Sequence, residues 1–378
     1  MKKVFIITGE SSGELYGALL ARELGNRRDN VRVMGVGGEM MRREGVELVA
    51  EISGAFGLME LVSSLRELRR TMNKVIRTIL NEKPDVVVLI DFPDFNIKVA
   101  KAIRHSGVKI LYYVSPQVWA WRKKRVNTIA KLSDYVAVIL PFEVEYYRDS
   151  GVKCEFVGHP IIEEIESVKG GKCYIKEQVG LQGDAPVLAL LPGSRDSEMK
   201  RLLPVLSRLV DLFKENYPDY QFIMPVALNI DRGKYNSLFD RLRQKGVRIV
   251  DGEAVRVLSC SDLAVVASGT AALQAALLEI PLVVIYRLSP LTYWIGRMIV
   301  DVKYINLVNI MLDKEVIREL LQGMANADTI FNELKHTIED ENLRNWMIPQ
   351  FRKVGGFFAN RNASRRVSEI IGELAGWE

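Results

Sequence analysis

Short apolar runs rich in β-branched residues alternate with helical segments along most of this chain, and this alternation is its most constraining feature. In the first 160 residues the runs lie at 4–8, 31–36, 86–91, 109–114, 135–140 and 152–157. A second series lies at 187–191, 222–226, 247–250, 263–267 and 282–286. Continuous apolar runs of this length are typical of strands buried on both faces, and their alternation with helices indicates a parallel, doubly wound sheet. The sequence therefore predicts an α/β protein with two Rossmann-like domains that face a cleft.

The polar stretch 163–171 separates the two series and ends in Gly170 and Gly171, a composition typical of a linker. A chain of 378 residues is also too long for one ordinary core. We therefore predict an N-terminal domain over 1–165 and a C-terminal domain over 166–344. The last 60 residues are expected to be helical, and those from about 345 to 378 to join the N-terminal domain.

The composition narrows the class of protein. A net charge of +5 is too small for a dedicated nucleic-acid binder, but it is compatible with an anionic substrate or a membrane surface. Cys154, Cys173 and Cys260 are far apart and form no CxxC, so we expect them to be buried thiols in a reducing cytoplasm. The first apolar run is too short for a signal peptide, and no stretch supplies the roughly 20 apolar residues of a membrane span. We expect a protein that is soluble or lies on a surface.

The run from residue 86 ends in an aspartate. Asp91 is followed by Phe92, Pro93 and Asp94. Ligands of α/β proteins bind beyond the carboxyl ends of the strands, so Asp91 is expected to take part in the chemistry. Asp94 follows a proline and opens an apolar-periodic run, so we interpret it first as a helix cap.

Two turns of the second series are expected to hold a diphosphate. In the sequence LALLPGSRDSE, residues 188–198, Ser194 and Arg195 lie between a buried strand and a strong helix, so a serine hydroxyl, exposed backbone amides and a guanidinium are expected to meet at one helix N-terminus. An arginine contact is worth about 1.5–3 kcal/mol against about 0.3–1 kcal/mol for the helix dipole, so Arg195 should be the main phosphate ligand. The alternative is an exposed arginine paired with Asp196 or Glu198. The sequence ASGTAALQ, residues 267–274, repeats the strand–turn–helix arrangement.

The first turn, residues 9–17, has glycines at intervals of four but is neither a GxGxxG nor a Walker motif. Ser11 and Ser12 there either attract an oxyanion to the helix N-terminus or serve as a serine cap. The segment SPQVWAWRKKR, residues 115–125, places Trp119 beside basic residues, where it either stacks on a sugar, rests at a lipid interface or packs between the domains.

Residues 56–80 form a helical apolar stripe with arginines on the opposite side. Such a stripe either packs on a core or lies on anionic lipid. The three histidines are dispersed, although His159 follows a strand and is expected to line the cleft. The chain contains no Asp-x-Asp, so we expect a diphosphate site without a metal ion, and no cofactor.

Nine segments, taken together, closely resemble the lipid-A-disaccharide synthase family: TGESSGELYGA, VGVGGEMM, LIDFPDFN, YYVSPQVWAWRKKRV, LPFE, FVGHP, LLPGSR, ASGTAALQ and VVIYRL. They extend from residue 8 to residue 288 in the family's order. SPQVWAWR together with LLPGSR is the most specific part of the match. The resemblance implies an inverting glycosyltransferase with the two-domain GT-B type fold.

The family joins UDP-2,3-diacylglucosamine to 2,3-diacylglucosamine 1-phosphate (lipid X), which releases UDP and forms a β-1,6-linked disaccharide. By resemblance, Asp91 is the general base that removes the proton of the acceptor 6-hydroxyl, and Arg195 with the 268–270 turn stabilises the departing UDP. Expected contacts to the donor are Ser194, Arg195, Ser268, Gly269, Thr270, Gln274 and Asn309. Expected contacts to the acceptor side are Ser11, Ser12, Gly13, Asp94, Asn96, Trp119 and His159.

Three positions depart from the family pattern. Glu14 stands where the first motif usually has aspartate, and Val308 where we expect proline. Gln274 stands where an acidic residue commonly reaches the donor ribose, and a glutamine can still hydrogen-bond a hydroxyl.

Both implied substrates carry acyl chains, and burial is worth about 0.8 kcal/mol per methylene, so the enzyme must visit the membrane. We expect a cytoplasmic protein, peripheral on the inner membrane, and the resemblance also allows a homodimer. Its expected membrane-facing patch comprises Phe56, Leu58, Met59, Leu61, Val62, Arg66, Arg69 and Arg70. Two alternatives stay open. One is another UDP-sugar enzyme of this fold, such as a 2-epimerase or the peptidoglycan N-acetylglucosaminyltransferase. The other is a catalytically silent nucleotide-sensing or membrane-surface protein.

Overall fold

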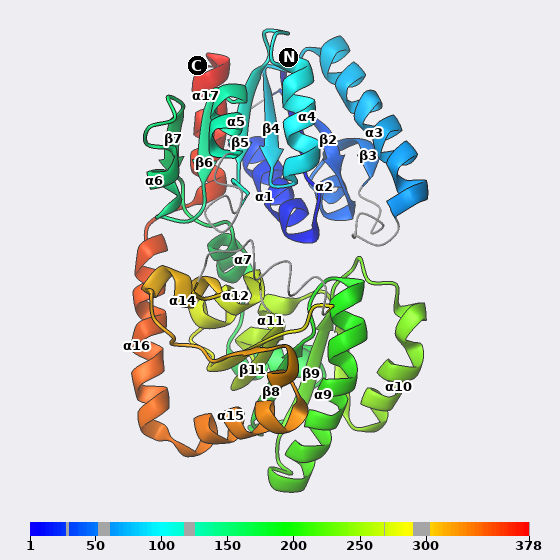
Figure 1. The fold of residues 1–378 in the computed structure, drawn as a ribbon, viewed down its shortest axis with the longest axis vertical. Helices are drawn as coiled ribbons and strands as arrows, with labels where there is room; N and C mark the ends of the chain where they lie inside the picture. The colour runs from blue at the N-terminus through cyan, green and yellow to red at the C-terminus, as the bar shows by residue number, and fades with distance from the viewer. Residues whose placement is uncertain (28–29, 52–60, 117–124, 268, 290–302, 378) are drawn as a thin grey trace. The chain divides into compact units, whose positions relative to one another are not determined.

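The computed structural model describes residues 1–27, 30–51, 61–116, 125–267, 269–289 and 303–377, except for the side chains of residues 11, 61–65 and 67. By its contacts the chain divides into two compact units (Figure 1). The first unit comprises Met1–Glu163 and Asn360–Glu378, and the second comprises Glu164–Ala359. The chain thus returns to the first unit at residue 360, about 15 residues later than we predicted. The difference arises because helix α16 (Glu341–Phe358) packs on α12 (Thr270–Leu277) and α14 (Leu307–Leu312) of the second unit.

The first unit is built on a seven-stranded parallel sheet of order β3-β2-β1-β4-β5-β6-β7. Its strands are β1 (Lys2–Ile7), β2 (Val31–Gly37), β3 (Glu47–Glu51), β4 (Val86–Ile90), β5 (Lys109–Tyr113), β6 (Tyr135–Val138) and β7 (Lys153–Phe156). All five residues of β4 are fully buried, as the continuous apolar run predicts. Strand β3 was not predicted, because it is an edge strand that begins and ends in exposed glutamates.

Helices cover both faces of this sheet. On one face α3 (Leu61–Glu82) packs beside α4 (Pro93–Ile103), and α4 packs beside α5 (Arg125–Leu132). On the other face α1 (Ser11–Arg27) packs with α17 (Ala363–Ala375). Three short helices complete the unit: α2 (Glu39–Arg43), α6 (Glu143–Tyr147) and the start of α7 (Ile161–Ser167). The apolar side of α3 packs on the core from Leu68 to Ile79, and Val75 and Ile79 are fully buried there.

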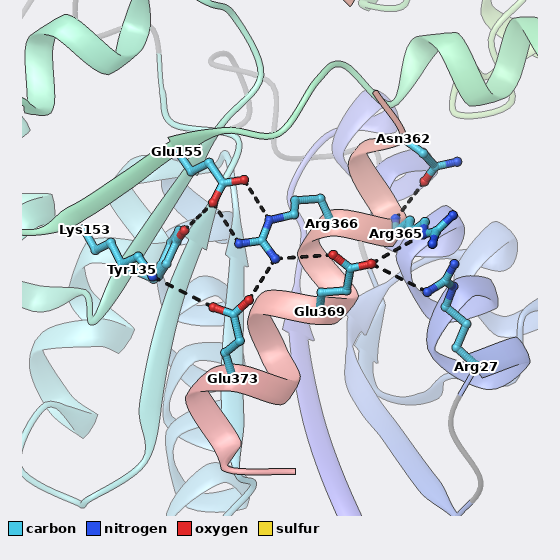
Figure 2. A network of polar contacts seen from close by, with 9 residues as sticks. All are labelled: Arg27, Tyr135, Lys153, Glu155, Asn362, Arg365, Arg366, Glu369 and Glu373. Atoms are coloured by element: carbon cyan, nitrogen blue, oxygen red, sulfur yellow. Dashed lines mark hydrogen bonds and ion pairs between the residues drawn. The ribbon is translucent and has the colours of Figure 1, made fainter. Parts of the chain in front are cut away.

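The C-terminal helix α17 is attached to this sheet by a network of ion pairs (Figure 2). Arg366 donates two hydrogen bonds to the carboxylate of Glu155 on β7, at 2.7 and 2.9 Å. The hydroxyl of Tyr135 on β6 donates to the same carboxylate at 2.6 Å. Glu369 lies 3.7 Å from Arg27 at the end of α1. A two-pronged arginine–carboxylate contact fixes orientation as well as position, so α17 belongs to the first unit by specific contacts.

The second unit contains a six-stranded parallel sheet of order β10-β9-β8-β11-β12-β13. Its strands are β8 (Val187–Leu191), β9 (Gln221–Val226), β10 (Val247–Asp251), β11 (Leu263–Ala267), β12 (Leu282–Tyr286) and β13 (Glu319–Leu321). The short strand β13 was not predicted. The helices are α8 (Lys172–Gln178), α9 (Asp196–Asn216), α10 (Asn236–Gln244), α11 (Ala254–Ser259), α12 (Thr270–Leu277), α14 (Leu307–Leu312), α15 (Ala327–Glu339) and α16, with short 3-10 turns at Arg232–Tyr235 and Gln322–Met324.

Each sheet has one switch point, a strand whose neighbours on its two sides belong to the two directions in which the strand order runs. In the first unit β1 pairs with both β2 and β4, and in the second β8 pairs with both β9 and β11. Ligands of doubly wound sheets bind beyond the carboxyl ends of the strands at such a switch point. The fold therefore directs attention to the turns that follow β1, β4, β8 and β11. None of the helices in the described ranges combines the length and apolar character that crossing a bilayer needs.

Candidate active site

The four turns at the two switch points are the ones that the motifs indicated. In the first unit residues 8–13 follow β1 and residues 91–94 follow β4. These two turns touch, because a Cβ atom on Gly9 would overlap the side chain of Phe92. Position 9 must therefore be glycine, because any larger residue would overlap the side chain of Phe92.

The backbone at Asp91 is held in an unusual conformation. Asp91 and Phe92 have φ angles of 45° and 44°, in the left-handed region that residues other than glycine rarely adopt. Val114, at the end of the neighbouring strand β5, has a φ of 61° and is β-branched. Such residues cost about 1–3 kcal/mol each and persist where the surrounding structure fixes them, often at functional sites.

Three hydrogen bonds fix Asp91. Its N–H donates to the carbonyl of Val114 at 3.2 Å. Its carbonyl accepts from Nδ2 of Asn96 at 2.7 Å and from the hydroxyl of Tyr112 at 2.9 Å. We call these contacts the Asp91 clamp. The clamp uses only the backbone of Asp91 and leaves its half-buried carboxylate for other contacts.

Two expectations for this turn are corrected. Asn96 was expected to contact the acceptor, but it is fully buried and belongs to the clamp. Asp94 does not cap α4, because Pro93 already occupies the first helical position and the N-cap residue is Phe92. Asp94 lies in the first turn, is exposed and forms an ion pair with Arg125. A carboxylate there still interacts favourably with the helix dipole.

His159 is buried, with 2% of its surface exposed. Burial lowers the pKa of its imidazole to about 3, so the ring is neutral at neutral pH. Its Nδ1 accepts a hydrogen bond from the N–H of Ile161 at 3.2 Å, and Tyr16 meets the ring edge-on. His159 is therefore a neutral hydrogen-bonding group that is held in one orientation.

Among the other expected acceptor contacts, Ser12 is half-buried and Gly13 is buried at the start of α1. Trp119 lies outside the described residues, as does the side chain of Ser11. Glu14 accepts the N–H of Met40 at 2.8 Å, and burial raises the pKa of its carboxyl. Glu14 thereby fixes the turn before α2.

In the second unit, a carboxylate occupies amides that were expected to hold phosphate. Oε2 of Glu198 accepts the N–H of Ser194 at 3.0 Å and that of Arg195 at 3.2 Å. Gly193, with a φ of 101°, makes room for this carboxylate, because a Cβ atom there would overlap it. The expectation of exposed amides at this turn is thus wrong. Arg195 remains more than half exposed, with its guanidinium 3.9 Å from Glu198.

The turn after β11 is different. Gly269, exposed and with a φ of 140°, is the N-cap of α12, and as a glycine it has no side chain that could accept the first N–H groups of this helix. Thr270 is the first helical residue, while Ser268 lies outside the described residues. Gln274 lies one turn further along α12. Its Nε2 is already bound within the chain, because it donates a hydrogen bond to Glu164 at 2.8 Å.

Asn309 is fully buried and its side chain is saturated by its own chain. Its Oδ1 accepts the N–H groups of Val316 and Ile317, and its Nδ2 donates to the Ile317 carbonyl and to Glu319. The side chain therefore supports the loop after α14, where a contact to nucleotide was expected. Glu319 also accepts the N–H groups of Ile305 and Asn306 at 3.0 Å.

Sequence reasoning overlooked the carboxylates of Glu164 and Glu319, and it named Glu198 only as a possible partner of the Arg195 side chain. A signal existed for Glu198, which lies three residues after the N-cap of α9, the spacing of a capping box. Glu164 and Glu319 bind partners more than ten residues away, and no local pattern indicates them.

Within the described chain, no three His, Cys, Asp or Glu side chains are grouped so that they could hold a metal ion. In the expected membrane-facing patch, Phe56, Leu58 and Met59 lie outside the described residues, as do the side chains of Leu61 and Val62. The remaining members, Arg66, Arg69 and Arg70, are exposed on α3. Lys74 and Arg77 extend this exposed basic face along α3. The same part of the helix lines a shallow groove, formed by Arg70, Asn73, Lys74, Arg77, Thr78 and Asn81.

The comparisons with known proteins decide the family. The model of the lipid-A-disaccharide synthetase family matches residues 4–370. The chain belongs to the lipid-A-disaccharide synthase family. It is 37% identical to the lipid-A-disaccharide synthase of Myxococcus xanthus over 98% of this chain and 97% of that protein. It is 42% identical to the synthase of Syntrophus aciditrophicus over 88% of this chain and 87% of that protein.

Solved structures support the fold of this synthase family member. A putative UDP-N-acetylglucosamine 2-epimerase from Listeria monocytogenes superposes with a TM-score of 0.71 at 13% identity, over 100% of this chain and 98% of that one. The S. aureus MnaA–UDP complex gives a TM-score of 0.69 at 13% identity, also over 100% of this chain and 98% of that one. The predicted fold class, two Rossmann-like α/β domains of the GT-B type with C-terminal helices, is confirmed.

The Asp91 clamp generates a prediction for stability. Tyr112→Phe should lower the free energy of unfolding by about 1 kcal/mol, because it removes a buried hydrogen bond to a strained residue. Tyr113→Phe is the matched control: it changes the next residue of the same strand, whose buried hydroxyl lies near Ser364 and takes no part in the Asp91 clamp. Urea denaturation of both variants measures the difference. Equal effects of the two substitutions would contradict the clamp.

Proposed function

We propose that this chain transfers the diacylglucosamine of UDP-2,3-diacylglucosamine to the 6-hydroxyl of 2,3-diacylglucosamine 1-phosphate. The products are the β-1,6-linked lipid A disaccharide 1-phosphate and UDP. The observation that carries the proposal is the clamped aspartate at the β1–β4 switch point of a chain that matches its family from residue 4 to residue 370. The first unit takes the acceptor, with Ser12, Gly13 and His159 near it, and the second unit takes the UDP-sugar.

Asp91 is the general base of this mechanism. Its carboxylate takes the proton of the acceptor hydroxyl as the oxygen attacks the anomeric carbon from the face opposite UDP, and the configuration inverts. A positioned base contributes about 10²–10⁴-fold to the rate, and the clamp fixes the backbone from which this carboxylate extends. His159, neutral at working pH, is suited to hydrogen bonding and not to proton abstraction.

Arg195 and the start of α12 stabilise the charge that develops on UDP. The amides of Ser194 and Arg195 are occupied by Glu198, so positive charge at the first turn comes from the Arg195 guanidinium. The start of α12, whose N-cap is a glycine, supplies backbone N–H groups at the second. A guanidinium and a helix end neutralise a diphosphate without a divalent ion, and we infer a metal-independent reaction on this basis.

The enzyme acts as a peripheral protein on the inner membrane. Both substrates are diacylated, and lipid chains gain about 0.8 kcal/mol for each buried methylene, so they remain in the bilayer. The exposed face of α3 offers Arg66, Arg69, Arg70, Lys74 and Arg77 over three helical turns. Within the described chain none of these five forms an ion pair. From Leu68 to Ile79 the apolar side chains of α3 pack on the core, so in this part of the helix the basic face is the surface available to anionic lipid.

Asp91→Asn tests the function. With both acylated substrates in detergent, the unmodified protein should produce disaccharide and UDP, and EDTA should leave turnover unchanged. Asp91→Asn should lower kcat by about 100-fold or more while UDP binding, measured by calorimetry, is retained. Asp85→Asn, at the opposite end of β4, is the control and should keep its rate. Full turnover of Asp91→Asn would remove Asp91 from the mechanism, and full turnover of non-acylated UDP-sugar would contradict the substrate assignment.

Membrane binding is tested separately by co-sedimentation with vesicles that contain anionic phospholipid. Lys74→Gln/Arg77→Gln removes two charges from the basic face of α3. At roughly 1 kcal/mol per cation near the surface, vesicle affinity should fall about tenfold or more. Lys98→Gln/Lys101→Gln removes two exposed charges from α4 and serves as the control. Equal losses for the two pairs would show a response to net charge only.

A further inference from the structure

The Glu164 carboxylate is a polar group that the proposed mechanism does not use. Glu164 lies on α7 and is half-buried, and burial raises the pKa of its carboxyl. Its Oε2 accepts the hydrogen bond from Nε2 of Gln274, which is 7% exposed. Among the described residues, no lysine or arginine pairs with this carboxylate, and its Oε1 has no hydrogen-bond partner. A largely buried carboxylate without a cation is costly, and such groups concentrate at functional sites.

The position of the pair relates it to the start of α12. Gln274 follows Thr270 by four residues, so the two side chains lie on the same face of α12, about one turn or 5.4 Å apart. The carboxylate is therefore placed one helical turn beyond the N-terminal N–H groups that the proposed function assigns to a phosphate. Glu163, the preceding residue, instead accepts the N–H of Ser364 at 2.8 Å, so the two adjacent glutamates have different partners.

A nucleoside diphosphate presents an anion and, a short distance away, two neighbouring hydroxyls on its ribose. Carboxylates hold ribose hydroxyls in dinucleotide-binding α/β proteins, close to the helix end that holds the phosphates. An ionised carboxylate accepts several hydrogen bonds, whereas the Nε2 of Gln274 is already used to hold Glu164. Of the two side chains, only Glu164 presents a charged acceptor.

We propose that Glu164 accepts hydrogen bonds from the ribose hydroxyls of the UDP moiety and that Gln274 is a positioning residue for its carboxylate. This replaces the expectation that Gln274 itself reaches the ribose. The proposal rests on the proposed function, because it assumes that UDP binds at the start of α12.

Calorimetric titration with UDP and with 2′,3′-dideoxy-UDP tests this assignment. The unmodified protein should bind UDP about tenfold or more tightly than the dideoxy compound, as expected for loss of charge-assisted hydrogen bonds. Glu164→Gln should weaken UDP binding to the level of dideoxy-UDP and leave dideoxy-UDP binding unchanged. Glu163→Gln, the adjacent buried glutamate, should behave as the unmodified protein. Full discrimination by Glu164→Gln would overturn the proposal.

The exchange variant Glu164→Gln/Gln274→Glu returns one carboxylate to the pair. It should recover discrimination against dideoxy-UDP, and it keeps the proposal testable if Glu164→Gln alone fails to fold. An exchange variant that folds and binds UDP without discrimination would count against the pair as a ribose site. UDP binding by the unmodified protein without discrimination would contradict this inference alone. No UDP binding at all would contradict the proposed function as well.

Discussion

The left-handed backbone at Asp91 and Phe92 is the constraint on which the first unit depends. A chain leaving a buried parallel strand has little freedom, and here it turns within two residues into α4. The turn exists because Gly9 leaves room for Phe92, and because Tyr112 and Asn96 bind the Asp91 carbonyl. Gly9 and Phe92 follow strands β1 and β4, Tyr112 lies on β5, and Asn96 lies on α4. Several elements at this edge of the sheet therefore fix the backbone at Asp91 together.

In the second unit, carboxylates determine which polar groups remain for a ligand. Glu198 satisfies the amides before α9, and Glu319 with Asn309 fixes the segment around α14. The N-cap of α12 is Gly269, which has no side chain, and Glu164 binds Gln274 in the second turn of this helix. In the proposed function an arginine and this helix end therefore take the phosphates, and a carboxylate takes the ribose hydroxyls.

The sequence predicted the elements whose signal is local. Continuous apolar runs such as 86–90 identified the central strands, because strands buried on both faces must be apolar throughout. Strand β3 was missed, since an edge strand flanked by glutamates lacks that pattern. The place of Asp91 directly after a buried strand was predicted from the sequence. The hydrogen-bond partners of Asn96, Asn309 and Glu164 were not, because only the folded chain brings them within hydrogen-bonding distance.

The central claim is that the clamp acts on catalysis through the Asp91 carboxylate. A double-mutant cycle on kcat with Tyr112→Phe and Asp91→Asn measures this coupling directly. If Tyr112 positions Asp91, Tyr112→Phe lowers kcat in the unmodified protein and has no further effect once Asp91 is asparagine. Additive losses in the two backgrounds would show that Tyr112 affects the rate by another route, and would contradict the account.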